Sequence, residues 1–123
     1  MTEQGQSSRL MSEWIEHRRE DDDELLGFLV PDGEWFTPVT VFGYPIAEPT
    51  DRDDAEESLD RIGLSYLAER WNLKRERQAP IQVEIVEASP QRVVVKNVDF
   101  GSELDYGTRF TLSAPVDGRL TLS

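Results

Sequence analysis

The sequence contains no cysteine, and this absence excludes several kinds of chemistry at once. Disulfide bonds, thiolate nucleophiles, iron-sulfur clusters and cysteine-rich zinc sites all require the missing thiol. His17 is the single histidine, so a multi-histidine metal site is excluded as well. Because a chain of 123 residues buries roughly two thirds of its unfolded surface on folding, it can build a core without such cross-links.

Long apolar runs are also missing. No apolar segment approaches the roughly 20 residues that a membrane-spanning helix needs, and the first residues lack the basic and apolar parts of a signal peptide. We therefore expect a cytoplasmic protein that has no membrane partner. The P-loop, the dinucleotide-binding glycine pattern and the nucleophile elbow of hydrolases are absent too. We expect no cofactor and no bound metal, and we assign no catalytic residue.

Basic residues are scarce relative to acids. The chain has 13 lysines and arginines against 25 aspartates and glutamates, which gives a net charge of −12. Residues 1–60 carry 17 acids and 4 bases (−13), whereas residues 61–123 carry 8 acids and 9 bases (+1). The field of the acidic half repels phosphates and anionic lipids and favours a basic protein as partner. The alternative is that the acidity only keeps a small protein in solution.

Residues 1–19 are expected to form an N-terminal helix. Leu10, Met11, Trp14 and Ile15 share one stripe at helical spacing. We expect the helix to dock through Trp14 and Ile15, because a lone helix of this length is marginal in water. Residues 20–24 are five consecutive acids that repel one another and suit a helix C-terminus poorly, so we expect an acidic hinge there.

Residues 25–123 are expected to form an α+β body within a single domain. LLGFLV, the turn residues Asp32-Gly33 and WFTPVTVF predict a hairpin, with Pro38 at an edge or facing away from its neighbour. A central helix should be capped by Thr50 or Asp51. Gly63 is either its stop residue or an interior glycine, and we favour the stop, before a second short helix.

After residue 71 the hydrophobic period changes to two, which predicts strands. Residues 88–91 should close one hairpin, and residues 114–118 should join RFTLS to RLTLS in another. The predicted fold class is therefore α+β. It has a mainly antiparallel curved sheet, or a small open barrel, of six to seven short strands, with an N-terminal helix and a central helical segment.

The period-two spacing also predicts a core on one face of this sheet. Its expected members are Leu25, Phe28 and Val30 or their alternates, together with Val39, Val41, Ile81, Val83, Ile85, Val93 and Val95.

The first functional hypothesis is a non-catalytic protein-interaction domain, such as an adaptor, inhibitor or immunity-like protein. Residues 20–24 and 51–57 are expected to form one continuous negative face, because neither segment lies in an apolar pattern. Consecutive acids on an extended chain point alternately apart, which makes a poor Mg²⁺ or Ca²⁺ cage. The expected partner-binding residues are Trp14, Asp21, Asp22, Asp23, Asp53 and Asp54.

Two alternatives come from other classes. Asp99, Glu103 and Asp105, in NVDFGSELDYG, suit a small hydrolase or lyase that uses carboxylates alone, or else a solvated loop of Asx turns. Residues 61–77 suit a small-barrel nucleic-acid binder, with Trp71 as a stacking residue. The basic residues of that stretch, which acids of the central helix could also neutralise within the fold, are Arg61, Arg70, Lys74, Arg75 and Arg77.

Overall fold

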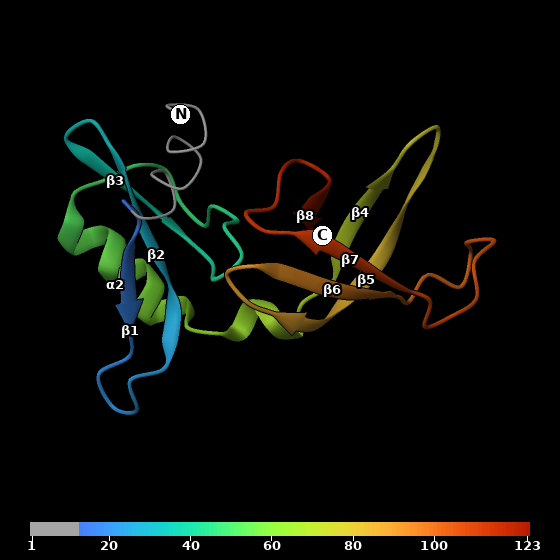
Figure 1. Cartoon of the computed structure of the whole chain (residues 1–123), viewed down its shortest axis with the longest axis horizontal. Helices are drawn as coiled ribbons and strands as arrows, with labels where there is room; N and C mark the ends of the chain where they lie inside the picture. The colour runs from blue at the N-terminus through green and yellow to red at the C-terminus, as the bar shows by residue number, and fades with distance from the viewer. Residues whose placement is uncertain (1–12) are drawn as a thin grey trace, which may run out of the picture. The chain divides into compact units, whose positions relative to one another are not determined.

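The computed structural model describes residues 13–123, and within them the chain is mostly β (Figure 1). This part contains eight strands, one α-helix and a single-turn 3-10 helix. Its contacts divide into two compact units. The first unit comprises residues 13–41 and 45–63, and the second comprises residues 42–44 and 64–123. Whether the two units unfold together, as a single domain would, stays a prediction.

The first unit contains a three-stranded antiparallel sheet in the order β1-β2-β3. The strands are β1 (Ile15–Arg18), β2 (Leu25–Asp32) and β3 (Trp35–Val39). The predicted β2–β3 hairpin is confirmed: Asp32 pairs with Trp35 across a two-residue turn. Gly33 has φ +64° at the first central position, which is the place that a type II′ turn reserves for glycine. Pro38 lies on the edge strand β3, as predicted.

The predicted N-terminal helix is wrong for the described residues, because residues 15–18 form strand β1; residues 1–12 lie outside the described part. Ile15 pairs with Leu29, and the Trp14 ring packs on Phe28 with centroids 5.8 Å apart. Both side chains therefore dock on the body, but from a strand. The physical reason is that β2 has an open edge with which residues 15–18 can pair. An isolated helix of this length is marginal in water, so pairing with β2 is the more stable arrangement.

Helix α2 (Arg52–Ile62) confirms the predicted central helix. The Asp51 carboxylate caps it by accepting a hydrogen bond from the Asp54 N–H at 2.8 Å, and Gly63 stops it with φ +58°. Ala55 and Leu59 pack against Leu29 of the sheet in a buried cluster. The second helix is a single 3-10 turn, η1 (Ser65–Ala68), in the second unit.

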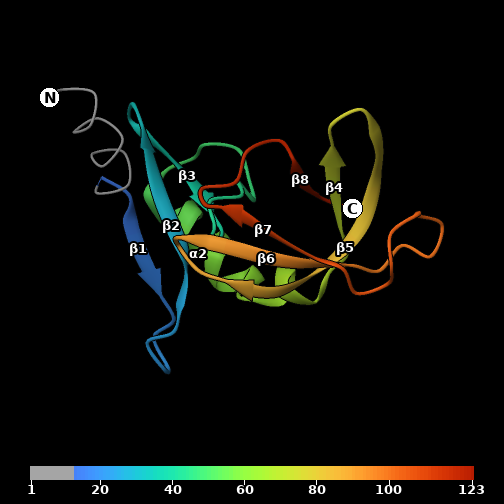
Figure 2. The ribbon, with the colours of Figure 1, turned by 45° about the vertical axis from the view of Figure 1, so that its right-hand side comes forward.

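The second unit contains a five-stranded antiparallel sheet in the order β7-β6-β5-β4-β8 (Figure 2). The strands are β4 (Trp71–Arg75), β5 (Gln78–Ala88), β6 (Arg92–Asn97), β7 (Arg109–Ser113) and β8 (Leu120–Leu122). Ala88 pairs with Val93 at the start of β6, so the hairpin predicted across residues 88–91 is confirmed.

The predicted hairpin between RFTLS and RLTLS is wrong. β7 pairs with β6 and β8 pairs with β4, so the two segments form opposite edges of the sheet. Each finds an apolar neighbour there, since Leu112 lies beside Val93 and Leu120 beside Leu73. Both sheets are open, so the predicted small barrel is wrong: the edge strands β7 and β8 do not pair. The predicted α+β class is also wrong, because the described chain is mostly strand and helix is the minor component.

Each unit has its own core, so the prediction of one core on one sheet face is wrong. In β2 both Phe28 and Leu29 are buried although they face opposite ways, and the predicted Leu25 and Val30 are only half-buried. In the second unit the predicted core valines and Ile81 are buried, but Ile85, the last residue before the register shift between Ile85 and Glu87, is half-buried. The residues of the predicted list that are buried are Phe28, Val39, Val41, Ile81, Val83, Val93 and Val95.

Candidate functional site

The five consecutive acids form the β1–β2 hairpin loop and not a hinge between a helix and a strand. Two backbone hydrogen bonds close the loop: the Arg19 N–H donates to the Glu24 carbonyl, and the Asp23 N–H donates to the Arg19 carbonyl, each at 2.8 Å. The Arg19 guanidinium also donates to both Asp22 carboxylate oxygens, at 3.0 and 3.1 Å. This contact lowers the pKa of Asp22 below its usual value. The loop is thus ordered by its backbone and by one ion pair.

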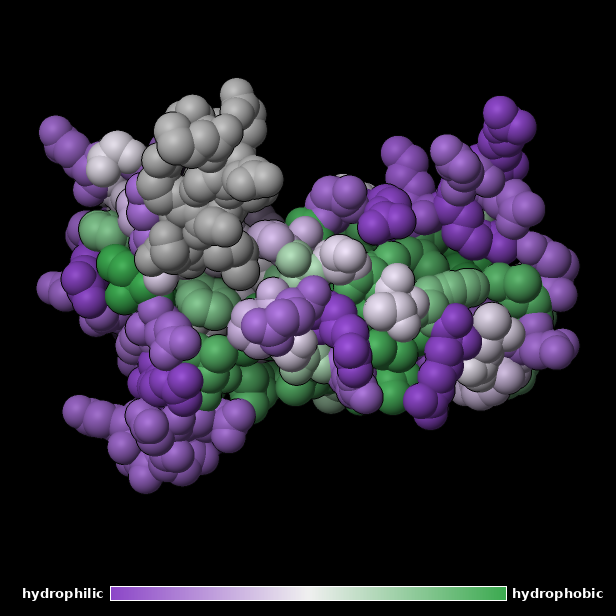
Figure 3. Space-filling view, in the orientation of Figure 1, coloured by the Kyte–Doolittle hydropathy of each residue, from purple (hydrophilic) through white to green (hydrophobic). Residues whose placement is uncertain are grey.

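Two carboxylates of the loop, those of Asp21 and Asp23, have no partner within the described chain. Asp21 and Asp23 are exposed, and their carboxylates make no hydrogen bond or ion pair with any residue from 13 to 123. No group of three or more histidine, aspartate or glutamate side chains in this part of the chain is arranged to hold a metal ion. Figure 3 shows hydrophilic side chains gathered over the loop, at the lower left of the view.

Helix α2 continues this acidic surface. Asp53, Glu57 and Asp60 are exposed and follow one another at i, i+4 and i+7, so they lie along one stripe of the helix. Asp60 accepts a hydrogen bond from the His17 Nε2 atom at 2.8 Å, and the His17 side chain is only 15% exposed. The imidazole of His17 therefore connects β1 to the helix.

The two acidic segments lie at opposite ends of α2. Thr50, just before the helix, pairs with Phe36 near the β2–β3 turn, whereas Asp60 reaches His17 near the β1–β2 loop. The 11 residues of the helix span about 16 Å between these ends. The exposed stripe therefore runs from one end of α2 to the other, and the continuous negative face of residues 20–24 and 51–57 stays a prediction. Asp53 and Asp54 lie in the first turn, where the helix dipole favours acids.

The net charge of the protein belongs to the first unit. Its described residues carry 16 acids and 4 bases (16 − 4, or −12), while the second unit carries 8 acids and 8 bases and is neutral. Trp14, the aromatic member of the predicted site, is half-buried against Phe28. Its main contact in the structure is therefore packing within the first unit, and its role in binding a partner stays a prediction.

The loop proposed for carboxylate catalysis is organised by its own acids. The Asp99 carboxylate accepts from the Gly101 N–H at 2.9 Å and from the Gln82 N–H at 3.3 Å. Glu103 forms an ion pair with Arg75 at 2.8 Å, and this contact lowers the pKa of Glu103. A general acid needs the opposite shift. Asp105 is exposed, so the three acids serve a turn, an ion pair and solvent.

Sequence reasoning missed the residue that holds this loop in place. Asn97 is fully buried, and its side-chain amide donates to the carbonyls of Leu104 and Asp105, at 3.4 and 3.1 Å. Its carbonyl oxygen accepts from the Asp99 N–H at 3.0 Å. A single asparagine after an apolar strand is too common a signal to have revealed this role.

The basic stretch does not present an aromatic platform. Trp71 is fully buried, with the rings of Phe42 and Tyr44 packed edge-on at 5.5 and 4.8 Å, and its indole N–H donates to the Tyr66 carbonyl. The predicted stacking role of Trp71 is therefore wrong, because a buried ring cannot stack on a base.

Two of the four arginines of the stretch form internal ion pairs, but not with the acids of α2. Arg70 pairs with Glu84 at 3.3 Å, and Arg75 pairs with Glu103.

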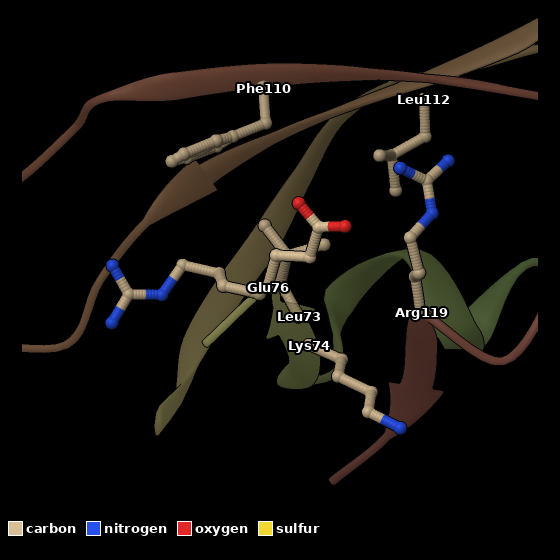
Figure 4. A pocket seen from close by; sticks show the side chains of 7 residues that line it. Leu73, Lys74, Glu76, Phe110, Leu112 and Arg119 are labelled. Atoms are coloured by element: carbon tan, nitrogen blue, oxygen red, sulfur yellow. The ribbon is translucent and has the colours of Figure 1, made fainter. Parts of the chain in front are cut away.

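A cavity in the second unit was not foreseen. It has a volume of about 520 Å³ and lies between β4 and β7. Strands β5 and β6 lie between these two strands in the sheet, so residues of β4 and β7 can line one cavity only if the sheet curves and this face is concave. Figure 4 shows Phe110 and Leu112 pointing into it from β7, with the Glu76 carboxylate and the Arg119 guanidinium pointing in from the other side. Its lining residues are Leu73, Lys74, Arg75, Glu76, Phe110, Leu112 and Arg119.

Within residues 13–123, no helix is both long enough and apolar enough to cross a bilayer. Comparison with protein-family models, with curated proteins and with solved structures finds no match to this chain.

Proposed function

We propose that the protein is a non-catalytic, cytoplasmic interaction domain whose first unit binds a basic protein through the β1–β2 loop and the exposed stripe of α2. The supporting observation is that Asp21, Asp23, Asp53 and Asp54 are exposed and make no side-chain ion pair with the described residues. These carboxylates are available to lysine and arginine side chains of a partner. The concentration of the whole net charge of −12 on this unit supports the same reading.

A partner of this kind would be recognised mainly by long-range attraction. Exposed charges on opposite surfaces accelerate encounter more than they increase the final affinity. Their effect is screened once the Debye length falls to about 8 Å, near physiological ionic strength. The association rate should therefore fall steeply with added salt, while the dissociation rate should change little.

Neither alternative function gains support from a specific contact. The lowered pKa of Glu103 is the reverse of what a carboxylate general acid requires. For nucleic-acid binding, Arg70 and Arg75 are engaged in ion pairs and Trp71 is buried.

Three double variants of the full chain test the proposal, each reducing the net charge by two. D21N/D23N neutralises the loop, and D53N/D54N neutralises the start of α2. Asparagine suits Asp23 in particular, because it tolerates the positive φ of +60° found there. The control E69Q/D105N changes two exposed acids of the neutral second unit that have no ion pair among residues 13–123.

The partner is captured from the native cell at low salt, identified and purified. Surface plasmon resonance then measures its association and dissociation rates with the wild type and with each of the three double variants. We expect a basic partner whose association rate falls about tenfold in the loop or helix variant, and with added salt, but not in the control. A partner that binds all four proteins alike, with no dependence on salt, would refute the proposal. Circular dichroism verifies that each variant is folded.

A further inference from the structure

The outer edge of β7 carries backbone groups that no described residue satisfies. The Asn97 N–H donates to the Thr108 carbonyl, and the Ala114 N–H donates to the Gln91 carbonyl. In an antiparallel pair, every second residue directs both its N–H and its C=O group to the partner strand, and the residues between direct both groups away from it. Phe110 and Leu112 therefore bond to β6. The residues between them point their N–H and C=O groups away from the sheet, and these are Arg109, Thr111 and Ser113.

This edge is open in the part of the chain that the structure describes. Arg109, Thr111 and Ser113 are all exposed, and β7 is the last strand of its sheet. No hydrogen bond joins their outward backbone groups to another residue from 13 to 123. Such a row of unpaired donors and acceptors is a template for one more strand.

Charge on the face away from the cavity indicates what kind of strand would fit. Along one row across the sheet, Arg70 pairs with Glu84, Glu84 lies opposite Lys96, and Lys96 lies opposite Arg109. The signs alternate until the last two positions, where two cations are neighbours. Like charges directly opposite each other are unfavourable, whereas opposite charges are favourable. A carboxylate beyond Arg109 would compensate this pair of cations.

The cavity face indicates the other positions of the added strand. Phe110 and Leu112 point into the cavity, so residues opposite them on an added strand would lie on the same face. Apolar side chains at these two positions would share the cavity with Phe110, Leu112 and Leu73.

We propose that the outer edge of β7 binds an extended peptide in antiparallel orientation, with an acidic residue opposite Arg109 and apolar residues opposite Phe110 and Leu112. This site goes beyond the acidic surface of the first unit and is independent of it. A second copy of this chain fits less well, because self-pairing of β7 would place Ser113 opposite Arg109 and would bring together two chains of net charge −12.

The probe is a capped synthetic peptide with the core Ser-Val-Thr-Val-Glu between pairs of glycines. Its threonine would pair with Thr111 and its glutamate with Arg109. We expect the amides of Arg109, Thr111 and Ser113 to exchange rapidly with solvent in the free full-length protein and to become at least about tenfold more protected with the peptide. Phe110 and Leu112 should be protected in both states. Nuclear magnetic resonance resolves these amides individually.

Two matched peptides identify the binding mode on the unaltered protein. N-methylation of the peptide's threonine removes a donor that faces β7, and we expect binding to weaken about tenfold. N-methylation of the first valine alters an amide that faces away, so it should be tolerated. A third peptide has lysine in place of glutamate. It should bind the wild type more weakly than the parent peptide does, and it should bind the Arg109→Glu variant more tightly than the parent peptide does.

Thr111→Pro removes an outward N–H without touching the ladder to β6, so it should abolish binding and keep the fold. Peptide binding weaker than about 1 mM, or unaffected by N-methylation of threonine, would overturn the proposal. A dimer that forms without peptide and is lost in Thr111→Pro would also overturn it, because the occupant would be a second copy. Shifts confined to cavity residues, without protection of the outward amides, would overturn it as well, because the peptide would then occupy the cavity and not the strand edge.

Discussion

At the scale of single residues, close packing in the first unit depends on a position without a side chain. Gly27 lies on β2 beneath helix α2, where a Cβ atom would overlap the Val39 carbonyl oxygen and would come within 3.0 Å of a Leu59 methyl group. The backbone of β3 and the Leu59 side chain of α2 can both approach residue 27 this closely only because it is glycine.

We therefore expect Gly27→Ala to destabilise the protein by about 1–3 kcal/mol, the range found when a packed core is overfilled. Urea unfolding followed by tryptophan fluorescence measures this loss. Gly118→Ala is the matched control, since nothing lies within 4 Å of its Cβ position, and it should change stability by no more than about 0.5 kcal/mol. Equal effects of the two substitutions would contradict the packing described for α2.

The Glu103–Arg75 ion pair makes a prediction about pH. Because Arg75 lowers the pKa of Glu103 in the folded protein, folding favours the ionised carboxylate. The resulting stabilisation is fully present above the pKa of the unfolded chain, which is about 4.3, and is lost as the pH falls through the lower folded value. Glu103→Gln should therefore lower the melting temperature at pH 7 more than at pH 3.

Thermal unfolding at the two pH values measures this difference. Asp105→Asn is the control, because its carboxylate lies in the same loop without an ion pair in the described chain. A melting-temperature gap for Glu103→Gln that is unchanged between pH 7 and pH 3 would show that the ion pair does not form in solution.

At the scale of elements, the register shift in β5 separates two residues that look equivalent in the sequence. Ile81 and Ile85 share one period-two face, but Ile81 is 2% exposed and Ile85 is half-buried beside the shift. Ile85 still pairs with Val95, and the regular ladder ends directly after it, so Ile85 lies where the regular pairing of β5 with β6 is interrupted. The sequence pattern contains no signal for this interruption.

Ile81→Ala should consequently destabilise the protein by about 2–5 kcal/mol, the usual cost of truncating a buried isoleucine. Ile85→Ala should cost less than about 2 kcal/mol, because part of the removed surface is already in contact with water. Chemical denaturation gives the free energy of unfolding of both variants. Each variant is the control for the other, because both carry the same isoleucine-to-alanine substitution on the same strand. A larger loss for Ile85→Ala than for Ile81→Ala would contradict the burial of these two side chains in β5.

At the scale of the whole molecule, the charge is divided between the units. The first unit carries −12 and the second is neutral, so mutual repulsion of carboxylates is concentrated in one part of the chain. Repulsion of this kind destabilises a compact state and weakens when salt shortens the Debye length.

Raising sodium chloride from about 10 mM to about 150 mM, which reduces the Debye length from about 30 to 8 Å, should therefore raise the melting temperature. A variant that combines D21N, D23N, D53N and D54N should show a smaller rise, because its first unit repels itself less. Scanning calorimetry gives both values and also shows whether the two units unfold in one transition. A melting temperature that falls with salt in the wild type would mean that favourable ion pairs outweigh the repulsion.

The sequence by itself determined the local elements that have strong signals of their own. Asp51 begins α2 because a capping carboxylate acts within one turn of the chain, whereas the sequence left Gly63 open between a stop and an interior glycine, and the structure shows the stop. Gly33 closes the β2–β3 hairpin for the same local reason. The acidic character of residues 20–24 and 51–57 is likewise a property of composition, whatever the fold does with them.

Only the tertiary structure decided what depends on partners distant in the chain. It made residues 15–18 a strand because β2 had a free edge, and it placed β7 and β8 at opposite edges of one sheet. It buried Trp71, which composition had presented as a stacking residue. It also brought β4 and β7 around one cavity. Pairing between strands is set by the competition of all available edges and apolar faces, and no local pattern contains the outcome of that competition.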